Sequence, residues 1–232
     1  MKVWVEGVMK IVVDRNEVLR YLGHRDQKID ENTCQLIETS VSEVLATLSR
    51  NYVYRIFALE SADSGVQLAR GRLVLSGTAI RLHLKGAVRC AVMALTLGPK
   101  IDEKIRLYSR TDVTRALVLD ACATAAVESL ADHVEAEIRT VAKTEGFFLT
   151  ERFSPGYGDL PITVQPDIIR ILAAREKIGL SVTDSCLLVP QKSVTAVAGI
   201  VGHVPEKHLK TCRDCNKYKE CSFRREGKHC NE

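Results

Sequence analysis

Residues 112–143, DVTRALVLDACATAAVESLADHVEAEIRTVAK, are the longest stretch of this chain with one sustained periodicity. Apolar and small residues recur every three or four positions, a spacing that predicts a single long helix with one buried face. Its alanine-rich centre, ACATAAVESLA, allows another element or a ligand to approach the helix closely. The residues expected on the buried face are Val113, Leu117, Ala121, Thr124, Val127, Ala131, Val134, Ile138 and Val141.

Shorter strand-like and helix-like segments surround this helix. Helices are expected after the capping residue Asp30, over residues 101–108, and from Pro166 to Gly179. Strands are expected at residues 3–13, 51–59, 72–75, 78–85, 87–97, 185–189 and 193–201, with a hairpin at Ser76-Gly77. Because strands and helices mix without strict alternation, the sequence predicts an α+β fold with a mainly antiparallel twisted sheet and packed helices.

The composition is that of an ordinary globular protein. Hydrophobic residues make up 46% and charged residues 27% of the 232 residues, which excludes disorder over the whole chain and collagen-like structure. No apolar run approaches the roughly 18 residues that span a bilayer. The first residues, MKVWVEGVMKIVVDR, lack the apolar core of a secretion signal, so a cytoplasmic protein without membrane contact is expected.

The eight cysteines divide into two groups. Four are scattered and are expected to be packing residues, whereas the other four lie within the last 21 residues. Residues 203–232 also carry eight basic and five acidic side chains, so their net charge of +3 supplies most of the overall +4. We therefore expect a main domain over residues 1–202 and a cysteine-rich tail over residues 203–232.

The cysteines of the tail have the spacing of a metal site. In a cytosolic chain such a cluster binds metal more often than it forms disulfides. The intervals of two, five and eight residues suit an iron–sulfur cluster, whereas structural zinc sites more often repeat a second short Cys-x2-Cys pair. Zinc and free thiols are the alternatives for the four residues Cys212, Cys215, Cys221 and Cys230.

A second group of motifs follows the long helix in a fixed order. The loop RFSPGYGDLP occupies residues 152–161, the segment GLSVTDS occupies residues 179–185, and Pro190 precedes Ser193-Val194. This pattern resembles the reactivation domain of cobalamin-dependent methionine synthase, the module that binds S-adenosylmethionine. The resemblance covers most of residues 10–201 and is strongest over residues 112–199.

The resemblance implies a set of ligand contacts in and before this loop. Arg152 would bind the ligand carboxylate, while Pro155, Gly156 and Tyr157 would shape the pocket. Glu128, on the preceding long helix, would contact the ammonium group or a ribose hydroxyl. The chemistry agrees, because a guanidinium binds a carboxylate with two prongs and glycine lets backbone approach a ligand. Without the family context, the loop would be an ordinary turn and Glu128 part of a solvated edge with Asp120, Thr124 and Asp132.

Two departures from the family pattern bear on the function. Gly158-Asp159-Leu160-Pro161 replaces the commoner Pro-Ala-Cys-Pro, and the final strand SVTAVAGIVG lacks the aromatic residues of the family. The chain also lacks the Asp-x-His-x-x-Gly motif that supplies a corrinoid with its lower histidine ligand. We therefore expect the cobalamin on a separate partner, a corrinoid-binding methionine synthase or a related corrinoid protein.

The first hypothesis is a reactivation subunit with no turnover alone. It would present S-adenosylmethionine to the partner's corrinoid during reductive remethylation, with a [4Fe-4S] cluster in the tail relaying an electron from a donor such as flavodoxin or ferredoxin. The alternative is a zinc-stabilised binding module whose basic tail contacts nucleic acid or protein. The tail has only two aromatic residues, Tyr218 and Phe223, which is few for base stacking, so nucleic acid is not expected as a partner.

Overall fold

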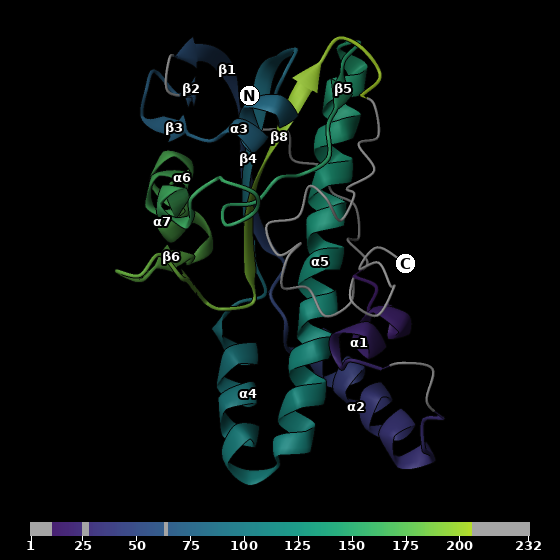
Figure 1. Cartoon of the computed structure of the whole chain (residues 1–232). Coiled ribbons are helices and arrows are strands. Elements are labelled where there is room, and N and C mark those ends of the chain that lie inside the picture. Colours follow the sequence, from purple (N-terminus) through teal and green to yellow (C-terminus); the bar gives the residue numbers. More distant parts are fainter. Residues whose placement is uncertain (1–10, 25–27, 63–64, 206–232) are drawn as a thin grey trace.

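A six-stranded antiparallel sheet lies between two layers of helices (Figure 1). The computed structural model describes residues 11–24, 28–62 and 65–205. The strand order is β3-β2-β1-β4-β8-β5, and a second, two-stranded sheet pairs β6 with β7. The strands are β1 (Asn51–Ala62), β2 (Gly65–Leu68), β3 (Leu73–Leu75), β4 (Ala87–Thr96), β5 (Phe148–Leu149), β6 (Ser181–Val182), β7 (Leu188–Val189) and β8 (Ser193–Val201).

Strand β4 forms the centre of the sheet, between β1 and β8. Its side chains alternate, so Ala91 and Met93 face one hydrophobic core, while Cys90 and Val92 face the other. Helices cover both faces, which explains why residues 87–97 are apolar almost without interruption. The predicted central strand is therefore confirmed.

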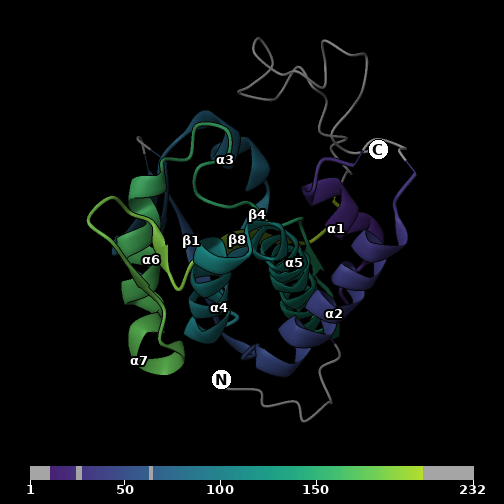
Figure 2. The same ribbon diagram turned by 90° about the horizontal axis from the view of Figure 1, so that it is seen from below.

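Helix α5 (Val113–Thr144) dominates the first face of the sheet, together with α1 (Arg15–Tyr21), α2 (Glu31–Thr47) and α4 (Pro99–Thr111). Figure 2 shows α1 and α2 beside α5, with the sheet on its other side. The alanines at the centre of α5, such as Ala123 and Ala126, are fully buried. The predicted stripe is wrong at its start, because Val113 and Leu117 are each 61% exposed. There α4 and α2 flank the helix below the sheet and bury Ala116 and Leu119 instead.

The second face carries α3 (Thr78–His83), the short 3-10 helix η1 (Ile162–Val164), α6 (Gln165–Leu172) and α7 (Ala174–Ile178). The strand predicted over residues 78–85 is wrong, because this segment contains α3. Ile80 and Leu84 lie four residues apart on its buried side, whereas Leu82 is 63% exposed. The helix predicted from Pro166 to Gly179 is two helices, since the chain turns at Ala173 with a φ of 51°.

The remaining predicted helices and strands agree with the structure in part. Asp30 caps α2 as expected, and its carboxylate accepts from the Thr33 amide at 2.9 Å. Residues 1–10 of the predicted first strand lie outside the described residues, and residues 11–13 are not a strand. Only Leu188–Val189 forms a strand within the predicted segment 185–189. In the part of the chain that the structure describes, no helix is long and apolar enough to cross a membrane.

Glu43 joins α2 to α4 and α5 and should make folding sensitive to acid. Burial would raise the pKa of Glu43, but hydrogen bonds from Lys104, Arg115 and Tyr108 lower it from 4.5 to about 2. Because the pKa is depressed, the stabilisation is present above about pH 4.5 and is lost as the pH falls towards 2. With both basic partners well exposed, we expect Glu43→Gln to lose on the order of 1–2 kcal/mol near neutral pH.

The measurement is urea unfolding of both proteins between pH 7 and pH 3. The difference between wild type and Glu43→Gln should shrink as the pH falls below 4.5. A difference independent of pH would show that the Glu43 carboxylate does not stabilise the three-helix junction through its charge.

Candidate functional site

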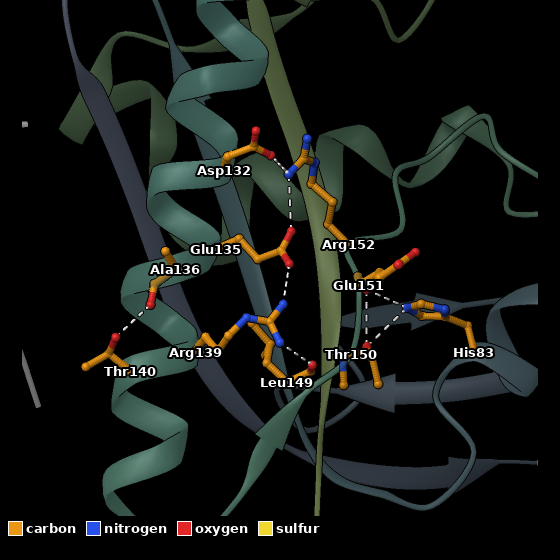
Figure 3. Close-up of polar contacts among 11 residues, drawn as sticks. His83, Asp132, Glu135, Ala136, Arg139, Thr140, Leu149, Thr150, Glu151 and Arg152 are labelled. Carbon is orange, nitrogen blue, oxygen red and sulfur yellow. Dashed lines mark hydrogen bonds and ion pairs between the residues drawn. The ribbon is translucent and has the colours of Figure 1, made fainter. Parts of the chain in front are cut away.

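The loop of residues 151–161 crosses from the end of β5 to the second face of the sheet, and contacts at its start fix it in place. Phe153 pairs with Val197 of β8 in an isolated bridge, with N···O distances of 2.8 and 2.9 Å in the two directions. His83 Nε2 lies 2.8 Å from the Glu151 carbonyl oxygen (Figure 3). The His83 ring also packs 5.1 Å from the Phe153 ring. The loop therefore begins on the rigid sheet.

Asp159 fixes the far end of the loop. Its carboxylate accepts hydrogen bonds from the amides of Thr78 at 2.6 Å and Ala79 at 2.9 Å, the first two residues of α3. These hydrogen bonds lower the pKa of Asp159, so the carboxylate is charged at neutral pH. Gly77 must be glycine here, because a Cβ at this position would lie 2.5 Å from an Asp159 carboxylate oxygen.

Arg152 lies next to the first of these anchors and reaches three carboxylates on α5, of which Figure 3 shows Asp132 and Glu135. Its Nη2 donates to Glu128 Oε2 at 2.7 Å. Its Nη1 donates to Asp132 Oδ1 at 2.5 Å and to Glu135 Oε2 at 3.2 Å. Glu128, Asp132 and Glu135 occupy one face of α5 because residues four and three apart are neighbours on a helix.

Charged side chains of alternating sign form a row of contacts from Arg152 through Glu135 to Arg139. Glu135 also accepts from Arg139 Nη2 at 2.6 Å, and Arg139 Nη1 donates to the Leu149 carbonyl at 2.9 Å. Burial alone would lower the pKa of Arg152, but the hydrogen bond and charge of Asp132 and the charge of Glu128 outweigh it and raise the pKa. The guanidinium is therefore charged at any physiological pH, in a site that presents both signs of charge at the surface.

The other predicted site residues lie further along the same loop. Gly156 has a φ of 92°, and a Cβ there would meet nothing within 4 Å, so its backbone is open to a ligand. Tyr157 is 66% exposed, whereas Pro155 is buried under the turn. The turn closes on itself, since the Gly156 amide donates to the Leu160 carbonyl at 2.9 Å. The structure thus brings Arg152 and Glu128 into contact and leaves Gly156 and Tyr157 accessible at the tip.

Sequence reasoning missed two residues of this site. Asp132 was expected only on a solvated helix edge, and Glu135 had no predicted role. The spacing of Glu128, Asp132 and Glu135 was the available signal, because it places three carboxylates on one helix face. Nothing in the local sequence indicates that Arg152, 17 residues beyond Glu135, returns to that face.

The predicted metal ligands Cys212, Cys215, Cys221 and Cys230 lie outside the described residues. Within the described ranges, no group of three or more His, Cys, Asp or Glu side chains could hold a metal ion. The four scattered cysteines there form no disulfide. Cys90 and Cys122 are buried as predicted, whereas Cys34 and Cys186 are only partly buried. A separate hollow of about 400 Å³ lies between α6 and the β6–β7 hairpin and includes none of the predicted site residues.

Comparison with known proteins places the chain in a family. Residues 83–209 match the model of the vitamin B12-dependent methionine synthase activation domain, and the chain belongs to this family. Among solved structures it is similar to a crystal structure of the MetH reactivation domain bound to AdoHcy, with a TM-score of 0.58 and 14% identity. That match covers 94% of this chain and 78% of the other, and it confirms the predicted α+β fold. No curated protein sequence matches the chain.

Proposed function

We propose that this chain is a reactivation subunit that binds S-adenosylmethionine at Arg152 and supports reductive remethylation of a partner's corrinoid. The observation that carries the proposal is the pair of Arg152 and Glu128, whose charged atoms lie 2.7 Å apart, with Arg152 in the same loop as the exposed Gly156. S-Adenosylmethionine ends in an amino-acid group with one carboxylate and one ammonium. A site with a guanidinium beside carboxylates complements both charges.

The family and the fold support the same ligand. The chain belongs to the methionine synthase activation domain family, and the similar crystal structure contains AdoHcy. AdoHcy, the product of methyl transfer from S-adenosylmethionine, has the same adenosine and amino-acid groups. A site that holds one through these groups can hold the other.

The residues of the chain would position the ligand rather than move protons. Arg152 would bind the carboxylate, Glu128 the ammonium group or a ribose hydroxyl, and the turn from Pro155 to Tyr157 would border the rest. No general base is needed, because a sulfonium is already an activated leaving group; holding its methyl carbon towards the partner is the contribution of the protein. The corrinoid of the partner supplies the cobalt that takes up one electron and then the methyl group, leaving S-adenosylhomocysteine.

The cysteine-rich tail would supply the electron. Four thiolates within residues 212–230 fit a [4Fe-4S] cluster, and the basic side chains among them suit an acidic redox partner such as flavodoxin or ferredoxin. Residues 203–232 would then be a separate electron-transfer unit attached to a ligand-binding domain of residues 1–202. The methyl donor and the electron would reach the corrinoid from one chain.

A reconstituted reaction tests the proposed function. The chain is incubated anaerobically with a corrinoid protein in its one-electron oxidised state, a reductant and S-adenosylmethionine labelled at the methyl group. We expect label on the corrinoid only when chain, reductant and S-adenosylmethionine are all present. Titration calorimetry should give a dissociation constant in the micromolar range. Absence of binding would remove the ligand assignment, and binding without methyl transfer would remove the reactivation role.

Metal analysis tests the tail independently. After anaerobic purification we expect about four iron and four sulfide per chain, with a brown colour that oxygen bleaches. Replacing Cys212 by serine should lower both contents, whereas replacing the buried Cys90 should leave them unchanged. A colourless protein with one zinc per chain would contradict the electron relay and support the alternative of a zinc-stabilised binding module.

A further inference from the structure

The guanidinium of Arg152 is already crowded with carboxylates. Arginine binds a carboxylate end-on by offering one N–H from each terminal nitrogen. Both hydrogens of Nη1 are engaged here, because that nitrogen donates to Asp132 and to Glu135. A ligand carboxylate can therefore pair end-on with Arg152 only if one of these two side chains leaves.

The surroundings of the two carboxylates decide which one leaves. The side chain of Asp132 is 70% exposed, so water replaces Arg152 as its partner at little cost. The side chain of Glu135 is 15% exposed and is also held by Arg139 at 2.6 Å. Displacing Glu135 would leave a poorly hydrated carboxylate and would break the row that ends on the Leu149 carbonyl.

We propose that Asp132 is a built-in competitor of the ligand carboxylate at Arg152, while Glu135 is the positioning residue that holds the guanidinium during the exchange. The inference rests on the proposed function, because it assumes that Arg152 receives the carboxylate of S-adenosylmethionine. Asp132 then lowers the affinity for the ligand, and it also selects for ligands that carry a carboxylate. A molecule without a carboxylate to replace that of Asp132 gains nothing from Arg152.

The direct test measures binding of S-adenosylmethionine to Asp132→Asn by titration calorimetry. Asparagine keeps the shape and removes the charge, so we expect the affinity to rise by up to about fivefold, the range that an ion pair with one well-exposed partner covers. Asp120→Asn is the matched control, since it removes the same charge from α5 about 18 Å away. At 0.1 M salt that distance exceeds the screening length of about 10 Å, so the control should bind as wild type does.

A second ligand separates competition from a general electrostatic effect. Decarboxylated S-adenosylmethionine keeps the ammonium and the sulfonium but has no carboxylate to place on Arg152. We expect Asp132→Asn to bind it no more tightly than wild type does. An equal gain for both ligands, or unchanged or weaker binding of S-adenosylmethionine by Asp132→Asn, would overturn the inference.

A double variant shows whether the effect passes through Arg152. In the Arg152→Lys background, where two-pronged pairing is lost, Asp132→Asn should give no gain. The outcomes also separate the two proposals. If Arg152→Lys binds S-adenosylmethionine as wild type does, the ligand assignment at Arg152 fails. If Arg152→Lys binds poorly and Asp132→Asn alone gives no gain, the ligand assignment stands and only the competition by Asp132 is wrong.

Discussion

Arg152→Lys should weaken the binding of S-adenosylmethionine by about 100-fold, with little change in folding. A lysine keeps the positive charge between Glu128 and Asp132, so the three carboxylates of α5 still have a cation beside them. It offers a compact charge instead of a planar fork and cannot pair with a carboxylate through two parallel hydrogen bonds. Hydrogen bonds between charged groups contribute about 1.5–3 kcal/mol each, and the loss of one accounts for the expected change.

Arg89→Lys is the matched control for this prediction. Arg89 has a similar side-chain exposure, 29% against 23% for Arg152, and it is also ion-paired, with Glu145 at 2.5 Å. It lies near the start of β4, and its guanidinium packs over the ring of Phe147, which precedes the 151–161 loop. We expect wild-type affinity for Arg89→Lys in titration calorimetry. Equal binding by Arg152→Lys and wild type would show that the ligand carboxylate is bound elsewhere.

Gly77→Ala should lower the free energy of unfolding by about 3 kcal/mol and loosen the ligand loop at the same time. With φ at 132° and ψ at 152°, Gly77 lies in a backbone region that essentially only glycine adopts. The added methyl group would also lie 2.5 Å from the Asp159 carboxylate that holds the loop on α3. Affinity for S-adenosylmethionine should therefore fall at temperatures where the variant is still folded.

Gly146→Ala is the control for a glycine with positive φ whose added Cβ would meet no neighbouring group. Gly146 also has a positive φ, 78°, but a Cβ there would meet nothing within 4 Å. We expect a loss of about 1 kcal/mol from the backbone alone, with unchanged ligand affinity. The measurements are urea unfolding and calorimetry on both variants. Equal losses of stability, or unchanged ligand affinity in Gly77→Ala, would mean that contact with Asp159 does not hold the loop.

The sequence predicts the elements whose pattern is local and misses those that distant residues decide. The central strand over residues 87–97 and the long helix are correct, because apolar runs and helical spacing persist over many residues. Residues 78–85 were assigned to a strand because Ile80, Leu82 and Leu84 alternate with polar residues. The segment instead forms a helix at Thr78–His83. Asp159, about 80 residues further along the chain, accepts hydrogen bonds from the first two backbone amides of this helix.

The residues of the candidate site also divide into those that sequence motifs predict and those whose role distant parts of the chain decide. Arg152 and Glu128 were predicted through the family resemblance, and the structure brings them into contact. Asp132 and Glu135 could not be assigned, because their role depends on where the loop returns across α5. Val113 and Leu117 show the converse error: their spacing fits a buried stripe, but among the described residues no element covers that side of the first turns of α5.

The anchoring of the ligand loop has a consequence for the energy of binding. Ordering a flexible segment costs roughly 1–2 kcal/mol per residue in conformational entropy, which a ligand must offset when it orders its own site. Here Phe153 is held by β8 and Asp159 by α3, so the turn between them is preorganised. The contacts that a ligand makes with Gly156 and Tyr157 can then contribute to affinity almost undiminished.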